Sequence, residues 1–450
     1  MYGSNRDPSK YFICWFALVV IVLSFFVYHR AAAQDEELFG EVNKQEAIRI
    51  VVGFLNDNYV FPDSGEIIGA ELLKRYKDGR YASKMTAEKF ARMIDSELEE
   101  ISRDKHLALF LDPAMNRGLR EEQDEDNYPD EDMLEEERRN NYGFKQAVIL
   151  EGNVGYLDLR IFFEPKSAAP SAVAAMGFLA NCDALIIDLR NNGGGWGEMV
   201  AFLSSYFFSA DSLIQLSSVY SRPDNKTYQS WTAPYVPGKR LITTPVYILV
   251  SKSTFSAAEE FCYNLKHLGR ATLVGETTRG GAHPISYKPV GEKFVLMIPE
   301  MTSINPVTGS NWEGVGVEPH IKTSSDKALE VAHLMALEEL KKCEDRKKAA
   351  WYQWHIEGLE AKNSPIELPE DITNSYIGKY GSMDITLEGG DLFYCRGGRM
   401  KHKLSPMSRV LFAIKGLENF RLKFIVEQNE VRELEVLYDD GRVAKYRKEK

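Results

Sequence analysis

The chain has 450 residues, of which 44% are hydrophobic and 27% charged, and its formal net charge is −11. This length is more than one hydrophobic core usually serves, so the composition indicates a globular protein of two or three domains. The acidic balance argues against a broad basic face, and nucleic acid is therefore not an expected partner.

Residues 1–33 carry targeting information. Arg6 and Lys10 flank a run of eighteen residues without a charge, and Ala31 and Ala33 follow it as an A-x-A pair. This order is typical of a secretory signal peptide. The run is also just long enough to cross a bilayer, which leaves an uncleaved membrane anchor as the alternative. Both interpretations predict an extracytoplasmic location, either periplasmic or secreted, with membrane attachment through the apolar segment if it is retained.

An N-terminal helical subdomain is predicted at residues 41–112. Apolar residues recur there at spacings of three and four, Pro62 interrupts the pattern, and Thr86 is placed to cap the helix that follows. Residues 113–144 contain "EEQDEDNYPDEDMLEEE", which has eleven acidic side chains and no basic one. Because like charges repel and resist burial, this segment is expected to be a solvated acidic loop.

The composition changes near residue 145. The runs "ALIIDL", "PVYILV" and "ATLVG" indicate buried strands, and helical or glycine-rich segments follow them. Buried strands alternating with helices predict an α/β core at residues 145–325. A helix and linker are expected at 326–365. Residues 370–450 alternate apolar and polar side chains between Gly-Gly and Asp-Gly turns, which predicts an antiparallel β module, either a barrel or a sandwich.

The cysteines give no sign of a metal site or a disulfide framework, because those outside the N-terminal segment show no C-x-x-C spacing. Cys182 and Cys262 lie in apolar stretches and are predicted to be buried thiols. No metal and no organic cofactor are expected.

Three loops follow the three predicted strands, at the edge where α/β sheets place ligand sites. The first contains Gly194 and Gly195, whose backbone N–H groups can turn toward a ligand without a Cβ in the way. The second places Ser256 at a helix start, where the helix dipole favours negative charge. Ser256 and Glu259 also form the pattern of a capping box, so a purely structural role is the alternative for this serine. The third loop carries His283.

These stretches resemble the C-terminal processing (tail-specific) serine peptidases. The match comprises D-L-R-N-N-x-G-G, the S-A-A-E stretch after a strand, and L-V-G-E-x-T-x-G, in that order within roughly residues 150–320. The resemblance implies a ClpP/crotonase-like core with Ser256 as nucleophile, a role compatible with a helix start. It also implies an oxyanion hole formed by the N–H group of Ala257 with that of Gly194 or Gly195.

The chain departs from the tail-specific pattern at the general base. Those peptidases carry a lysine in G-E-x-T-x-G-K, where this chain has Gly281. The chain is instead similar to the branch that contains the tricorn core and the interphotoreceptor retinoid-binding protein modules, which lacks a PDZ domain. That branch takes a histidine from a D-x-H stretch and a glutamate late in the core, which implies His106 as base and Glu313 as orienting carboxylate. His283 remains the alternative base.

The sequence thus predicts an exported serine endopeptidase that hydrolyses extended or unfolded polypeptides through an acyl-enzyme with a Ser–His–Glu triad. Such a triad works because an imidazole accepts the serine proton while a carboxylate orients the ring. The alternative is a non-catalytic protein that binds apolar ligands, since retinoid-binding modules of the same branch use this fold to do so.

Overall fold

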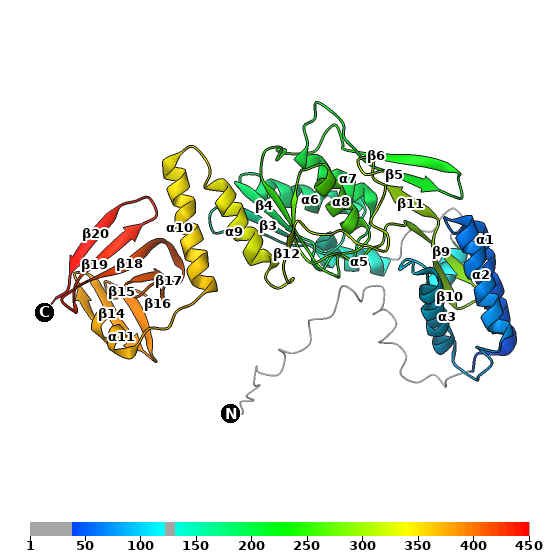
Figure 1. Cartoon of the computed structure of the whole chain (residues 1–450), viewed down its shortest axis with the longest axis horizontal. Coiled ribbons are helices and arrows are strands. Elements are labelled where there is room, and N and C mark those ends of the chain that lie inside the picture. The colour runs from blue at the N-terminus through cyan, green and yellow to red at the C-terminus, as the bar shows by residue number, and fades with distance from the viewer. Residues whose placement is uncertain (1–37, 122–130, 450) are drawn as a thin grey trace, which may run out of the picture. The chain divides into compact units, whose positions relative to one another are not determined.

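The computed structural model describes residues 38–121 and 131–449, so the predicted signal peptide or anchor at 1–33 lies outside the described residues. The chain forms two compact units: the first comprises the described residues up to Ile149 together with Gly155–Ala332, and the second comprises Leu150–Val154 together with the residues from His333 onward. The expected α/β core, N-terminal helical region and C-terminal antiparallel module are all present (Figure 1). Within the described ranges, no helix combines the length and apolar character needed to cross a membrane.

The N-terminal helices are α1 (Glu41–Asn58), α2 (Pro62–Lys77) and α3 (Ala87–Ser102). Pro62 occupies the first turn of α2, where its missing N–H costs no helical hydrogen bond. Thr86 caps α3, as predicted, by accepting a hydrogen bond from the Lys89 N–H at 3.2 Å.

These helices do not form a core of their own. The strand β1 (Ala108–Leu111) pairs antiparallel with β10 (Phe294–Pro299), which also pairs with β9 (Ile285–Val290). Buried side chains of α3 pack with those of β10 in one apolar cluster. The predicted boundary at residue 112 therefore does not separate two compact units, because strands almost 200 residues later in the chain cover the apolar face of the helices.

The prediction of an acidic loop at residues 113–144 is wrong for the two ends of this segment that the structure describes. They contain α4 (Pro113–Glu121), α5 (Glu131–Arg139) and the short 3-10 turn η2 (Asn141–Gly143). The Asp112 carboxylate accepts the N–H groups of the first turn of α4, at 3.1 and 2.9 Å. In α5, Glu135 pairs with arginines three and four positions later, so local ion pairs offset part of the acidic charge.

The core sheet has the strand order β12-β8-β7-β4-β3-β2, and β4, β7 and β8 are parallel neighbours. Its apolar residues pack against the helices α6, α7 and α8, and Cys182 and Cys262 are buried as predicted. The bounds are β2 (Phe144–Leu150), β3 (Val154–Leu159), α6 (Pro165–Leu179), β4 (Ala184–Asp188), α7 (Gly197–Ser204), η3 (Ser205–Phe207), β7 (Val246–Val250), α8 (Ala257–His267), β8 (Thr272–Gly275) and β12 (Ile321–Lys322).

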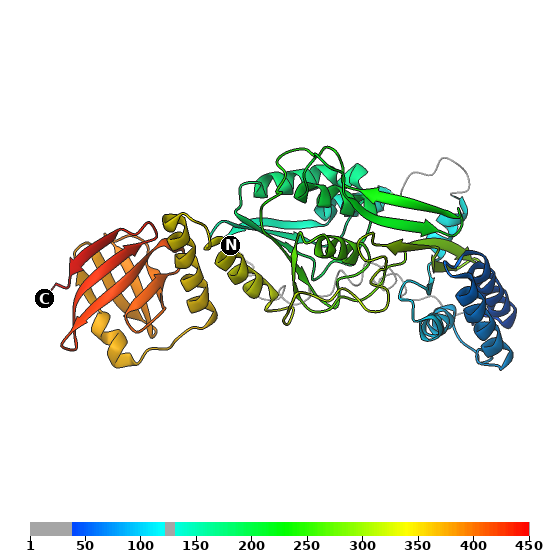
Figure 2. The ribbon, with the colours of Figure 1, turned by 45° about the horizontal axis from the view of Figure 1, so that its top comes forward.

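A second small sheet adjoins the core. The hairpin of β5 (Gln215–Ser221) and β6 (Lys226–Trp231) pairs through β5 with β11 (Met301–Ile304), and it extends outward from the helices of the core in both ribbon views (Figure 2). The segment at residues 282–284 accepts hydrogen bonds from β11, which ties this sheet to the loop that carries His283.

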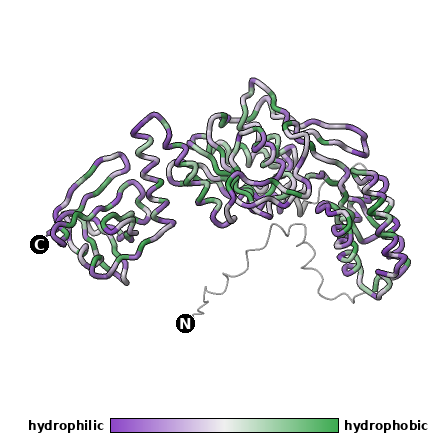
Figure 3. Tube along the Cα trace, viewed as in Figure 1, coloured by the Kyte–Doolittle hydropathy of each residue, from purple (hydrophilic) through white to green (hydrophobic). Residues whose placement is uncertain are grey.

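The second unit consists mainly of an antiparallel meander of eight strands that closes on itself, because Tyr380 bridges to Lys448 just after the last strand. The closed sheet is a barrel rather than a sandwich, and apolar and polar residues alternate along it (Figure 3). The bounds are α9 (Ala328–Leu340), which begins in the first unit, α10 (Arg346–Asn363), α11 (Glu370–Tyr376), β13 (Gly378–Tyr380), β14 (Met383–Glu388), β15 (Asp391–Arg396), β16 (His402–Pro406), β17 (Leu411–Ile414), β18 (Leu417–Glu427), β19 (Glu430–Tyr438) and β20 (Val443–Arg447).

A buried histidine predicts acid sensitivity of this unit. His355 on α10 is 7% exposed, and burial lowers its pKa to about 4. The unfolded chain therefore binds a proton at this residue between pH 6.5 and 4 that the folded protein does not, so stability falls as the pH is lowered. We expect hydrogen exchange of the barrel amides to report about 2 kcal/mol less stability at pH 5 than at pH 7 from this group. His355→Leu should remove that part of the difference.

The control for this experiment is Ile356→Val. Ile356 is the next residue of α10, is also buried and carries no titratable group, so its substitution should leave the pH dependence as it is. An unchanged pH dependence in His355→Leu would contradict the assignment of the acid sensitivity to His355.

Candidate active site

Ser256 lies at the turn between β7 and α8, at the carboxyl end of a central parallel strand. Its φ is 55° and its ψ −123°, a backbone conformation that is strained for any residue other than glycine. The serine of a nucleophile elbow occupies a sharp, strained strand-to-helix turn of this kind, which exposes its hydroxyl above the sheet. Ser256 is accordingly only half-buried.

The Glu259 carboxylate holds this turn in place. It accepts the Ser256 N–H at 2.9 Å, which is one half of the capping box predicted from the sequence. It also accepts the N–H groups of Gly280 and Gly281, at 2.7 and 2.9 Å, and the Thr278 hydroxyl. Burial raises the pKa of Glu259 to about 7, while these hydrogen bonds act in the opposite direction.

The glycine loop approaches the serine closely. A Cβ on Gly194 would lie 2.7 Å from the Ser256 Cβ, so only glycine fits at this contact. The Gly194 N–H donates to Asn192 Oδ1 at 2.9 Å. Within the described part of the chain, the N–H groups of Gly195 and Ala257 donate to no protein acceptor. Of the three predicted oxyanion donors, these two are therefore available to a ligand.

His106 lies against the residue before the serine. Its ring stacks on Phe255, with centroids 4.4 Å apart. A Cβ on Gly281 would lie 2.6 Å from His106 Cε1 and 2.3 Å from the Phe255 ring, so the absence of a side chain at position 281 makes room for both rings. Burial lowers the pKa of His106 to about 4, which keeps the imidazole neutral near pH 7. Its Nδ1 is buried and has no hydrogen-bond partner among the described residues.

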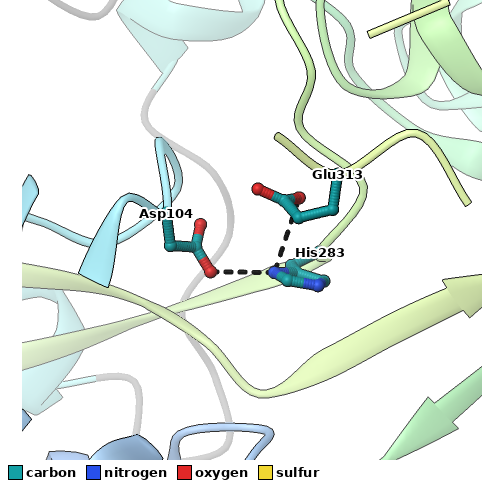
Figure 4. A group of neighbouring side chains, drawn as sticks. All are labelled: Asp104, His283 and Glu313. Carbon is teal, nitrogen blue, oxygen red and sulfur yellow. Dashed lines mark hydrogen bonds and ion pairs between the residues drawn. The ribbon is translucent and has the colours of Figure 1, made fainter. Parts of the chain in front are cut away.

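A buried cluster connects the N-terminal region to the core at this point (Figure 4). Asp104 Oδ2 accepts hydrogen bonds from His283 Nδ1 at 2.8 Å and from the Tyr59 hydroxyl at 3.0 Å. Asp104 Oδ1 accepts the His106 N–H at 2.9 Å, so this carboxylate fixes the turn that carries His106. Glu313 Oε2 lies 3.5 Å from His283 Nδ1. Burial opposes protonation of His283, but Asp104 and Glu313 outweigh it and raise the pKa of the ring.

The same cluster offers three ligand atoms within 4.8 Å of one another, one each from Asp104, His283 and Glu313. A divalent cation can bind to such a set. His283 and Asp104 are hydrogen-bonded to each other, and Glu313 Oε2 accepts the Ala282 N–H at 2.6 Å, so these contacts hold the three side chains in position. Among the described residues, the buried Oε1 of Glu313 has no hydrogen-bond partner. A cavity of about 370 Å³ lies beside it and is lined in part by Phe61 and Ile67.

The structure thus brings most, but not all, of the predicted site residues together. Gly194 contacts Ser256, and His106 packs beside it, whereas Glu313 contacts His283 rather than His106. In the described ranges, no hydrogen bond joins the Ser256 hydroxyl to either histidine. Sequence reasoning missed the role of Asp104, although its position two residues before His106 in "SRDKH" is a usable signal.

A strained serine at a strand-to-helix turn, with free backbone N–H groups and an imidazole close by, defines the class of site found in serine hydrolases. Residues 153–323 match the model of peptidase family S41, and residues 43–142 match that of the N-terminal domain of peptidase S41 in eukaryotic IRBP. The chain therefore belongs to peptidase family S41, in agreement with the resemblance noted from its motifs.

Individual relatives are distant. The chain is 30% identical over 129 residues to the carboxyl-terminal-processing protease of Picosynechococcus sp., a match that covers 28% of this chain and 29% of that protein. It is 25% identical over 191 residues to the carboxy-terminal processing protease CtpB of Bacillus subtilis, covering 42% and 38%. The chain thus spans less than two fifths of the length of these curated relatives.

Among solved structures, the photosystem II D1 C-terminal processing protease matches with a TM-score of 0.41 and 14% identity, covering 63% of this chain and 94% of that chain. The tricorn protease matches with a TM-score of 0.41 and 13% identity, covering 64% and 35%.

Proposed function

We propose that this protein is an exported serine endopeptidase that hydrolyses peptide bonds in extended or unfolded polypeptides. The observation that carries the proposal is the strained backbone of Ser256, held beside the free N–H groups of Gly195 and Ala257. Backbone strain persists only where the surrounding structure enforces it, and such strain is concentrated at functional sites. A serine that served only as a helix cap would not need this conformation.

The proposed reaction proceeds through an acyl-enzyme. The Ser256 hydroxyl attacks the carbonyl carbon of the substrate while an imidazole takes its proton, and the Gly195 and Ala257 N–H groups donate to the resulting oxyanion. The tetrahedral intermediate then expels the amine, which receives the proton from the imidazole. Water attacks the ester in the same way and releases the second product. This chemistry requires no metal and no organic cofactor.

His106 is the proposed general base. Its ring fills the space beside Gly281, the position at which the tail-specific peptidases carry their lysine, and it is neutral near pH 7. Glu313 is the proposed orienting carboxylate, although its present contact is with His283. Catalytic hydrogen bonds are often loose before substrate binds and tighten afterwards. His283, oriented by Asp104, is the alternative base.

Export rests on the sequence of residues 1–33, and the same segment supports the alternative of membrane attachment. Together with the peptidase chemistry, it predicts that the substrates are polypeptides encountered outside the cytoplasm.

Labelling with a serine-directed fluorophosphonate tests the proposed function. We expect one adduct per chain, located on Ser256 by peptide mass spectrometry, and no adduct on the heat-denatured protein, because only the folded site activates the hydroxyl. A folded protein that takes up no label would refute the proposal, and would favour the alternative of a non-catalytic protein that binds apolar ligands.

A further inference from the structure

The buried carboxylate of Glu259 joins two segments that are separate in the chain, and we infer that Glu259 is a positioning residue for catalysis rather than only a helix cap. It holds together two segments: the turn that carries Ser256, and the backbone at Gly281, where the absence of a side chain leaves room for His106. This inference rests on the proposed function, since it concerns the peptidase site.

Both carboxylate oxygens of Glu259 are fully used, and the side chain is 0% exposed. Oε2 accepts the Ser256 N–H and the Gly281 N–H, each at 2.9 Å. Oε1 accepts the Gly280 N–H at 2.7 Å and the Thr278 hydroxyl. A single oxygen atom therefore links the backbone of the nucleophile to the backbone of residue 281.

The two linked positions are those at which geometry matters most. Ser256 has a φ of 55°, which a serine keeps only if its surroundings enforce it. Gly281 lies where an added Cβ would come within 2.6 Å of His106, so a shift of this backbone closes or opens the space that the imidazole occupies. Movement of the Glu259 carboxylate consequently displaces the nucleophile and the base relative to each other.

A capping role alone does not account for these contacts. In a capping box the Glu259 carboxylate needs to accept only the Ser256 N–H, whereas three of the four donors to Glu259 belong to residues 278–281, outside the helix. The next residue of the same helix, Glu260, is bonded instead to the Ser217 hydroxyl of β5 at 2.8 Å. Glu260 thus provides a matched control: an acidic side chain of the same helix that touches neither linked segment.

The experiment compares Glu259→Gln with Glu260→Gln in the full chain. Glutamine keeps the size of the side chain but turns one acceptor oxygen into an N–H₂ donor, which faces two of the N–H or O–H groups that Glu259 now satisfies. We expect Glu259→Gln to lower kcat for an unstructured protein such as casein by about 10- to 100-fold with KM within about 2-fold, because the reacting groups are misplaced while substrate binding is unaffected. Glu260→Gln should stay within about 2-fold of the parent in both constants.

Fluorophosphonate labelling of Ser256 supplies a second readout, and it should slow in Glu259→Gln by a factor similar to that for kcat. Near-ultraviolet circular dichroism establishes whether each variant is folded. Glu259→Asp covers the case in which the glutamine variant fails to fold: it keeps both oxygens and the charge but withdraws them by one methylene, and we expect a loss of about 3- to 10-fold in kcat.

The outcomes separate this inference from the proposed function. If the parent protein does not hydrolyse casein, or Ser256→Ala still does, the proposed function itself fails. If the parent and Ser256→Ala behave as expected, an unchanged kcat in folded Glu259→Gln, or a change confined to KM, overturns the positioning role. Should Glu259→Gln be unfolded, parental kcat in Glu259→Asp overturns it equally.

Discussion

Replacing Ser256 with alanine is expected to lower kcat for hydrolysis of an unstructured protein by about 10⁶-fold while leaving the fold intact. The hydroxyl is the attacking atom, and the remaining imidazole and N–H groups cannot form an acyl-enzyme without it. Stability should change little, because the substitution removes one oxygen from a half-buried residue and retains the Glu259 contact to the backbone N–H. Peptide release measured by mass spectrometry, together with a thermal melt, tests both expectations.

Ser253→Ala is the matched control, since Ser253 lies three residues earlier in the same turn and is also half-buried. It should hydrolyse the substrate at the parental rate within about 2-fold, as is usual for substitutions away from the reacting groups. Residual activity above about a hundredth of the parental rate in Ser256→Ala would exclude this residue as the nucleophile.

The local elements of the core were predictable because each rests on a short stretch of sequence. The strands that became β4, β7 and β8 are continuous apolar runs, and a parallel sheet buried on both faces needs such runs. Parallel strands connected by helices bring their carboxyl ends to one edge of the sheet. The proximity of the Gly194 and Ser256 loops, which the structure shows, could therefore be predicted from the order of the strands alone. The strain at Ser256 itself has no such sequence signal.

Contacts between distant segments could not be read in the same way. Asp104 and His283 are 179 residues apart, and no periodicity in either segment indicates that they pair. The pairing of β1 with β10 is of the same kind, and it explains why the boundary at residue 112 is not a boundary between compact units. The sequence could therefore name the candidate bases, His106 and His283, but could not determine which carboxylate each one meets.

Net charge misled the prediction for residues 113–144. The run of acidic residues suggested a solvated loop, but helix formation at its described ends depends on individual neighbours. Asp112 caps α4, and Asn116 within that helix donates to the Phe294 carbonyl at 2.5 Å. The helix α4 contains a single acidic residue, Glu121, so the acidic run does not describe this part of the segment, and a tertiary hydrogen bond and a cap stabilise the helix.

Exchange of the two histidines for glutamine distinguishes the candidate bases. We expect His106→Gln to lower kcat by about 10³- to 10⁶-fold, because a neutral imidazole next to Phe255 and the Ser256 turn is the proton acceptor in the proposed reaction. His283→Gln should cost only about 10-fold, since this ring acts through its hydrogen bond to Asp104, which in turn holds the backbone of His106.

Each variant serves as the control for the other, because both change a buried histidine of the same unit and both keep Ser256. Steady-state kinetics and the rate of fluorophosphonate labelling should rank them in the same order if His106 takes the proton. The reverse order, with His283→Gln inactive and His106→Gln only slowed, would make His283 the base and Asp104 its orienting carboxylate.

Substitution of the carboxylates distinguishes further between His106 and His283 as the base. If His106 is the base, Glu313 must turn toward it when substrate binds, so Glu313→Gln should lower kcat far more than His283→Gln does. If His283 is the base, Glu313 already contacts it at 3.5 Å, and Asp104→Asn should lower kcat more than Glu313→Gln does.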